Sequence, residues 1–89
     1  MNHIPLDVLA SNINEFGWKI LNLINENDHA TFNEVRSELG LSQEKSYKEI
    51  ARLEGALLIV SNRDPKDQRS ILYSLSEYGK QLFDLKNRQ

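Results

Sequence analysis

Residues 41–79 read LSQEKSYKEIARLEGALLIVSNRDPKDQRSILYSLSEYG, and the order of structural signals along them decides the fold. Ser42 is a strong helix N-cap in front of a helix-length segment. Leu57–Val60 then make a short apolar run with β-branched residues, as in a buried strand. Turn residues at 64–67 (DPKD) lead into ILYSL, where apolar residues alternate with period two. This order predicts a helix followed by a two-stranded ribbon.

A shorter helix is expected immediately before this stretch, over residues 31–40. Thr31 and Glu34 have the spacing of a capping box, and Gly40 suits the left-handed residue that ends a helix. A helix, a glycine-containing turn and a second capped helix form a helix-turn-helix. The chain of 89 residues therefore predicts one winged helix-turn-helix domain, α+β and mostly α, with a two- or three-stranded β-wing. Its expected parts are the helix-turn-helix at about 31–56, the wing at about 57–75 and a C-terminal helix at about 76–87.

Two helices are expected before residue 31. The first is short, over residues 3–11. The second carries apolar residues at the spacing of one helical face: Ile13, Phe16, Ile20, Leu21 and Ile24. Gly17 inside that helix suggests a close helix contact. Trp18 lies off the apolar face, where it either covers a crevice or contributes to a dimer interface.

The helix that follows Ser42 has one apolar row and one polar surface. Ile50 and Leu53 belong to the row, and so does Ser46, whose hydroxyl is expected to bond a carbonyl one turn back. The opposite surface presents Gln43, Glu44, Tyr47, Lys48, Ala51 and Arg52. In a major groove, the N-terminal part of such a helix reaches base edges while basic residues meet phosphates.

Composition and charge limit the classes of function. The net charge is −2, but residues 36–69 hold seven bases against six acids, so a phosphate-binding face has to come from the middle of the chain. The chain has no cysteine, and its N-terminus lacks the basic start and apolar run of a signal peptide. We therefore expect a cytoplasmic protein that does not enter membranes.

Catalytic and metal-binding patterns are not evident in the sequence. His3 and His29 have no carboxylate at the spacing of a metal site, and no serine has a histidine at a suggestive distance along the chain. A glycine-rich phosphate loop is also missing. We expect a protein that is not an enzyme and that needs no cofactor.

The second half of the sequence resembles the MarR family of winged-helix regulators. The matching residues are Leu53-Glu54, Asp67 and Arg69 in the wing, and the run LSEYG at 75–79. The resemblance implies that Arg69 enters the minor groove and that Asp67 orients it. The family usually has glycine where this chain has Leu57. We therefore expect the helix to end near Gly55, with Leu57 outside the left-handed conformation, which would cost about 1–2 kcal/mol.

These features predict sequence-specific binding of double-stranded DNA by a transcriptional regulator, with the recognition helix in the major groove and the basic wing toward the minor groove. The expected DNA-binding residues are Gln43, Glu44, Lys45, Tyr47, Lys48, Arg52, Arg63, Lys66, Asp67 and Arg69. A homodimer is expected, with Leu6, Leu9, Phe83 and Leu85 at its interface. The long C-terminal helices of the family are missing from this sequence, which argues against effector sensing. The alternative is a winged-helix module that binds protein, or a partner-dependent regulator with little DNA affinity of its own.

Overall fold

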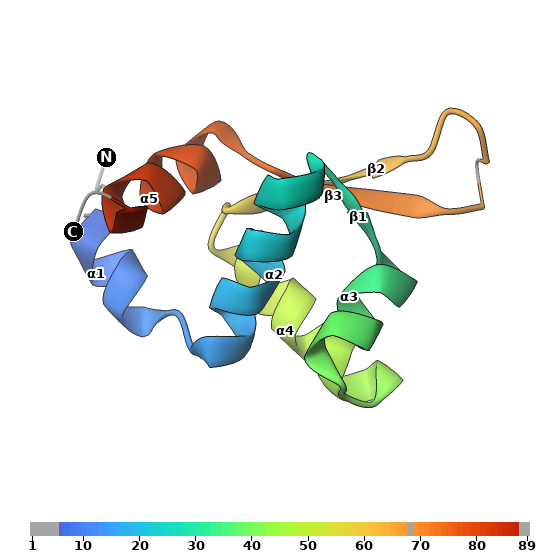
Figure 1. The fold of residues 1–89 in the computed structure, drawn as a ribbon, viewed down its shortest axis with the longest axis horizontal. Coiled ribbons are helices and arrows are strands. Elements are labelled where there is room, and N and C mark those ends of the chain that lie inside the picture. Colours follow the sequence, from blue (N-terminus) through green and yellow to red (C-terminus); the bar gives the residue numbers. More distant parts are fainter. Residues whose placement is uncertain (1–5, 68, 88–89) are drawn as a thin grey trace.

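The computed structural model describes residues 6–67 and 69–87 and has the expected mostly helical, winged-helix architecture (Figure 1). The elements in chain order are α1 (Leu6–Asn12), α2 (Glu15–Asn27), β1 (Ala30–Thr31), α3 (Phe32–Leu39), α4 (Gln43–Gly55), β2 (Ile59–Arg63), β3 (Ile71–Leu75) and α5 (Glu77–Asn87). Helices α3 and α4 form the helix-turn-helix. Strands β2 and β3 form the wing hairpin. None of the described helices has the length and apolar character needed to cross a membrane.

Side-chain caps define the starts of the central helices. Thr31 and Glu34 make both hydrogen bonds of the predicted capping box at the start of α3, and Gly40 ends that helix with a φ of 66°. The Ser42 hydroxyl accepts from the Lys45 amide at 3.2 Å and begins α4, as predicted. The Asn14 side chain does the same for α2 by accepting from the Gly17 amide at 2.8 Å. The turn between α3 and α4 is thus fixed at both ends.

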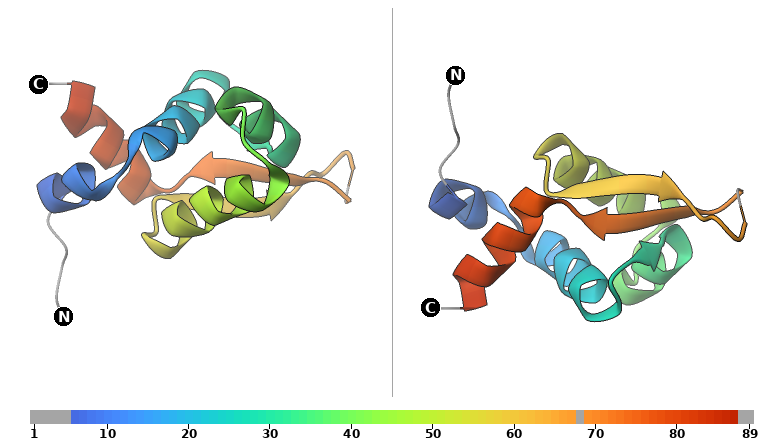
Figure 2. Two further views of the ribbon diagram at one scale, coloured as in Figure 1. Left: turned by 90° about the horizontal axis from the view of Figure 1, so that it is seen from below. Right: turned by 90° about the horizontal axis from the view of Figure 1, so that it is seen from above.

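The sheet has three antiparallel strands in the order β1–β3–β2. Tyr73 in the central strand pairs with Ala30 on one side and Ser61 on the other. Figure 2 shows α4 on one side of the hairpin and α2 with α3 on the other, while α1 and α5 lie at the end away from the wing tip. The wing therefore projects from the same end of the molecule as the helix-turn-helix.

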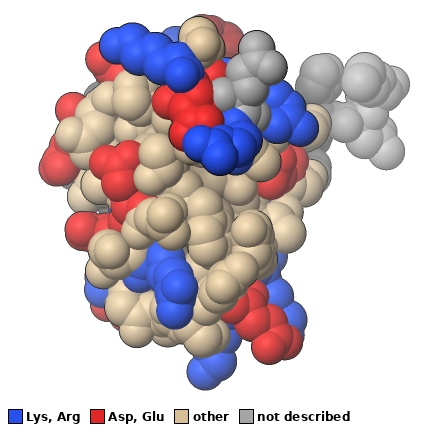
Figure 3. Space-filling view, turned by 90° about the vertical axis from the view of Figure 1, so that its right-hand side faces the viewer, with Lys and Arg blue, Asp and Glu red and all other residues tan. Residues whose placement is uncertain are grey.

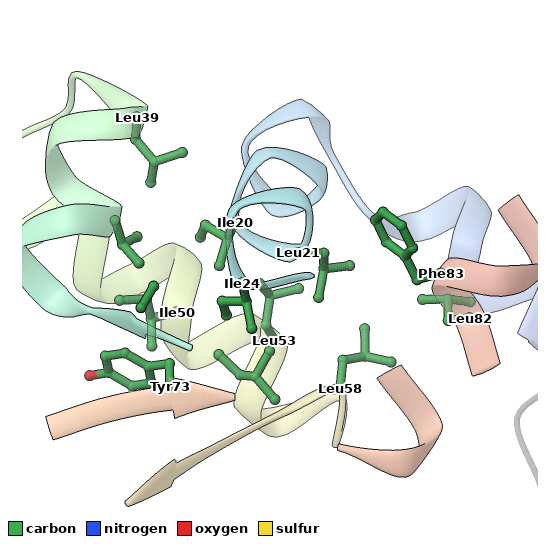
Figure 4. Close-up of a cluster of buried hydrophobic side chains, with 13 residues drawn as sticks. Ile20, Leu21, Ile24, Leu39, Ile50, Leu53, Leu58, Tyr73, Leu82 and Phe83 are labelled. Carbon is green, nitrogen blue, oxygen red and sulfur yellow. The ribbon is translucent and has the colours of Figure 1, made fainter. Parts of the chain in front are cut away.

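The core fills the space between α2, α4, the sheet and α5 (Figure 4). Ile20, Leu21 and Ile24 of α2 are completely buried, as their spacing predicted. Gly17 lies against this core, because a Cβ there would stand 2.7 Å from Ile13 Cγ2 and 3.5 Å from Leu53 Cδ2. The tight approach at Gly17 is therefore to Ile13, just before α2, while Leu53 of α4 lies at an ordinary van der Waals distance. Trp18 is half-buried and packs against the core.

The expectation for Leu57 is wrong, because this residue does adopt the left-handed conformation, with a φ of 64°. Helix α4 ends at Gly55 as expected. The Leu57 amide then bonds the Glu54 carbonyl and the Leu58 amide bonds the Leu53 carbonyl, each at 3.0 Å, which is the Schellman pattern. This reversal buries Leu58 completely against the core and leaves Leu57 71% exposed. Burial of Leu58 offsets the strain at Leu57.

Two further expectations need correction. The first strand of the wing begins at Ile59 rather than Leu57, because Leu57 and Leu58 belong to the turn that ends α4. The Ser46 hydroxyl was expected to bond a backbone carbonyl, but it is fully buried and has no hydrogen-bond partner among the described residues. Ser46 thus occupies an apolar position of the core at a cost in stability.

Candidate nucleic-acid interface

The exposed surface of α4 carries the polar residues that the sequence assigned to it. Ser46, Ile50 and Leu53 are buried on the opposite side of the helix. The exposed side chains are Gln43, Glu44, Lys45, Tyr47, Lys48 and Arg52. The sequence therefore assigned the two faces of this helix correctly.

The wing tip is built by two aspartate side chains that bond backbone amides. Asp64 Oδ1 accepts from the Lys66 amide at 2.8 Å, and Asp67 Oδ1 accepts from the Arg69 amide at 3.1 Å. The Ser70 amide also bonds the Asp67 carbonyl at 2.9 Å. Such aspartate turns hold a short loop without any apolar packing. The tip consequently keeps Arg63, Lys66 and Arg69 exposed.

Asp67 also pairs with the side chain of Arg69. The Arg69 Nε lies 3.5 Å from Asp67 Oδ1, while the second carboxylate oxygen of Asp67 accepts from the Ser70 hydroxyl at 3.3 Å. The Arg69 side chain is 95% exposed, so its guanidinium points into solvent. An ion pair this exposed adds at most about 1 kcal/mol to stability. Its main effect is to limit the directions that the arginine samples.

One hollow joins α4 to the wing. Tyr47 and Arg69 both line it, together with Thr31, Phe32, Asn33, Ser70, Ile71 and Tyr73. The rings of Phe32 and Tyr47 stack with their centroids 4.0 Å apart and their planes at 19°. Figure 3 shows this side of the molecule, where a mostly uncharged surface lies between basic and acidic groups above and below it. The structure thus brings α4 and Arg69 of the wing to a shared surface.

Arg52 lies apart from this hollow. Its guanidinium is 3.7 Å from the Glu49 carboxylate, which also accepts from the Asn14 side chain at 3.1 Å. Arg52 and Glu49 line a separate small hollow that includes Gly17 and the link between α1 and α2. Arg52 is therefore tied to the start of α2 and does not meet the wing residues there.

Tyr73 is the described residue whose ionisation is clearly perturbed. Burial raises the pKa of its hydroxyl above the ordinary value of 10.0, and the nearby Glu54 and Tyr47 raise it further. A tyrosine hydroxyl is already protonated at neutral pH, so the raised pKa matters only in alkaline solution. Among residues 6–67 and 69–87, no three His, Cys, Asp or Glu side chains gather as metal ligands would.

The residues predicted for a dimer interface have different surroundings. Phe83 is only 8% exposed and belongs to the core, because it packs between α5 and α2 (Figure 4). It offers little surface to a second copy. Leu85 is half-buried. The side chains of Leu6 and Leu9 lie outside the described residues.

Sequence reasoning missed Phe32 and Ile71 as parts of this surface. Phe32, the first residue of α3, is half-buried and its ring stacks on that of Tyr47. Ile71, the first residue of β3, is 42% exposed and lines the hollow with Arg69. The available signal was their position in the sequence: Phe32 directly follows the capping residue Thr31, and Ile71 lies two residues after the wing arginine Arg69.

No protein-family model and no curated protein sequence matches the chain. Solved structures do match it. NadR in complex with 4-hydroxyphenylacetate gives a TM-score of 0.81 at 26% identity, over 94% of this chain and 59% of that one. A mutant MarR from E. coli, complexed with operator DNA, gives 0.77 at 21% identity, over 90% and 56%. A mutant ZitR from Lactococcus lactis gives 0.76 at 25% identity, over 84% and 51%.

This chain spans less than two thirds of the length of each of these three proteins. The similarity covers nearly the whole of the described chain, including the helix-turn-helix and the wing. The chain thus has the winged-helix fold of MarR-type transcriptional regulators.

Proposed function

We propose that this domain binds double-stranded DNA as a transcriptional regulator, with α4 in the major groove and the wing toward the minor groove. The observation that carries the proposal is the hollow that Tyr47 of α4 and Arg69 of the wing both line. A recognition helix and a basic loop on one surface suit adjacent grooves of a duplex. The mutant MarR of similar fold is complexed with operator DNA, which supports DNA binding by this fold.

The proposed roles follow from exposure and charge. Gln43, Glu44 and Tyr47 lie at the start of α4, where a recognition helix reaches base edges. Lys45 and Lys48 are exposed beside them and suit phosphates. Arg63 and Lys66 suit the phosphates that flank the minor groove, while Arg69 suits the narrow groove itself. Arg52, paired with Glu49, is the weakest member of the predicted set.

We further infer that the domain acts as a homodimer. A single domain of this size offers few phosphate contacts, which gives weak binding at physiological salt. Helices α1 and α5 pack together at the end away from the wing, so a two-fold axis there leaves both recognition helices free. Val8 of α1 is 44% exposed at that end. Light scattering would measure the mass in solution, and a monomer at all concentrations would contradict this inference.

NMR titration tests which face binds. Amide signals of the protein would be followed while random-sequence duplex DNA is added at low salt. We expect shifts in the first half of α4 and between β2 and β3, with α5 unaffected. Shifts centred on α1 or α5, or none at all, would contradict the proposal.

A protein-binding module is the second candidate. The exposed apolar side chains of Leu57 (71%) and Val60 (44%) favour it, because they lie close together in the chain outside the hollow that Tyr47 and Arg69 line. The same titration distinguishes the two candidates. A module of this kind would leave the amides of α4 unshifted by DNA at any salt concentration.

A further inference from the structure

The contact between Phe32 and Tyr47 joins the first residue of α3 to the second turn of α4. The centroids of the two rings lie 4.0 Å apart and their planes make an angle of 19°, so the rings are stacked in close contact. Tyr47 nevertheless remains 49% exposed. One face of the Tyr47 ring is therefore held by protein, while its remaining surface is open to a ligand.

A tyrosine on the outside of a helix ordinarily samples several rotamers, and binding would have to freeze them. The stack on Phe32 removes part of that freedom before any ligand arrives. Phe32 itself is fixed, because it begins α3 directly after the Thr31 capping box and packs on the core. The orientation of Tyr47 is thus set by a residue of the other helix of the helix-turn-helix.

Among the residues that line the hollow with Tyr47, Arg69 is charged and the others are uncharged. Ile71, 42% exposed, lies in the same hollow, and Figure 3 shows uncharged atoms across the middle of this side. The apolar surface of Tyr47 and Ile71 offers little to a phosphate group. The apolar group that a major groove offers is the 5-methyl of thymine, which apolar side chains read.

We propose that Tyr47 is a specificity-determining residue that contacts a thymine methyl group, and that Phe32 is the positioning residue that holds its ring. This inference rests on the proposed function. It adds a preference for one base and the stacked pair of rings that produces this preference. The apolar edge of the Tyr47 ring makes the contact, and its hydroxyl is not required.

Site selection from a random duplex pool tests the proposal. The wild-type protein and the variants Phe32→Leu, Tyr47→Phe and Tyr47→Leu would each select their sites. Phe32→Leu removes the stacking ring but keeps an apolar residue, whereas Tyr47→Phe keeps the stack and removes only the hydroxyl. Phe16→Leu is the matched control, because Phe16 is also half-buried against the core but lies on α2.

We expect wild type, Tyr47→Phe and Phe16→Leu to select a thymine at the same fixed position. Uracil at that position, which lacks the methyl group, should weaken their binding by about fourfold, as for one apolar carbon left unburied. Phe32→Leu and Tyr47→Leu should bind the selected site by a similar factor more weakly. The affinity of these two variants should not change when thymine is replaced by uracil. The salt dependence of their binding should equal that of wild type, because no charge has changed.

Two results would overturn the inference, and they are distinguishable. If Phe32→Leu and Tyr47→Leu keep the thymine preference and the uracil effect, DNA binding stands but the role of the stacked pair is wrong. If the wild-type protein binds no duplex at low salt, the proposed function fails and the inference fails with it. Should Phe32→Leu melt far below Phe16→Leu, Tyr47→Leu decides alone, because its side chain is half exposed.

Discussion

The Ser76 hydroxyl donates a hydrogen bond of 2.6 Å to the Leu57 carbonyl, and so ties the start of α5 to the end of α4. The same oxygen accepts from the Gly79 amide at 2.9 Å and caps α5. The Ser76 amide also bonds the Leu58 carbonyl at 3.0 Å. One serine thereby joins two helices that lie on either side of the wing in the sequence. These bonds give Ser76 and Gly79 of the run LSEYG a role in holding the fold together.

Gly79→Ala should destabilise the fold strongly. A Cβ at Gly79 would overlap the carbonyl oxygen of Leu58, which is backbone and already bonded to the Ser76 amide. We expect a loss of about 2–3 kcal/mol in the free energy of unfolding, as for an overpacked core position. Thermal or urea unfolding measures it. Gly55→Ala is the control, because a Cβ there meets no described atom within 4 Å. Equal stability of the two variants would contradict this packing.

Ser46→Ala should stabilise the protein. The Ser46 hydroxyl is completely buried and has no hydrogen-bond partner among the described residues, so its removal abolishes a desolvation cost. We expect a gain of about 1 kcal/mol in urea unfolding. Ser42→Ala, in the same helix, should instead lose about 1 kcal/mol because that hydroxyl caps α4. A loss of stability in both variants would mean that the Ser46 hydroxyl is satisfied.

Stability should fall in alkaline solution, partly because of Tyr73. Its pKa is raised in the folded state by burial, then by Glu54 and Tyr47, so the folded protein holds this proton more tightly than the unfolded chain. The contribution is complete below the unfolded pKa of 10.0 and is lost as pH rises through the folded pKa. Urea unfolding across that range should show a shallower decline for Tyr73→Phe than for wild type. An identical decline in stability for the two proteins would contradict the raised pKa of Tyr73 in the folded state.

Asp67→Asn should weaken DNA binding even though it removes a negative charge from the interface. The charge change alone would strengthen binding, but the variant also releases the Arg69 side chain from its ion pair. We expect the affinity for DNA to fall by up to about fivefold for Asp67→Asn, which corresponds to the free energy of an exposed ion pair. For Arg69→Ala we expect a fall of about tenfold. Anisotropy titrations would measure both.

Asp64→Asn supplies the control for charge. The Asp64 carboxylate bonds the Lys66 amide in the same wing tip, and the substitution changes the net charge by the same amount. Its affinity should therefore equal or exceed that of wild type. If Asp67→Asn behaves in the same way, the positioning role of Asp67 is wrong.

The sequence predicted those parts of the fold that depend on local chemistry. The capping box at Thr31, the left-handed Gly40 and the Ser42 cap were confirmed, because each needs only a side chain and the backbone beside it. The exposed face of α4 followed from the spacing of Ile50 and Leu53. In each of these cases, neighbours in the sequence are also the neighbours in space.

The errors arose where distant packing overrides local preference. Leu57 takes a left-handed conformation that leucine disfavours, because the reversal there buries Leu58. The Ser46 hydroxyl is left without a hydrogen-bond partner because its position belongs to the core. Phe32 stacks on Tyr47 only because the turn between α3 and α4 brings them together. No pattern within a single element indicates contacts of this kind.

The central claim is that the exposed face of α4 and the wing bind duplex DNA, and its most direct test is fluorescence anisotropy over a salt series. The wild-type protein would be titrated into random-sequence duplex DNA. Lys45, Lys48, Arg63 and Lys66 provide about four phosphate contacts, so the logarithm of the association constant should fall with the logarithm of salt concentration with a slope of about −3.6 per domain. Absence of binding at low salt, or a slope near zero, would contradict the claim.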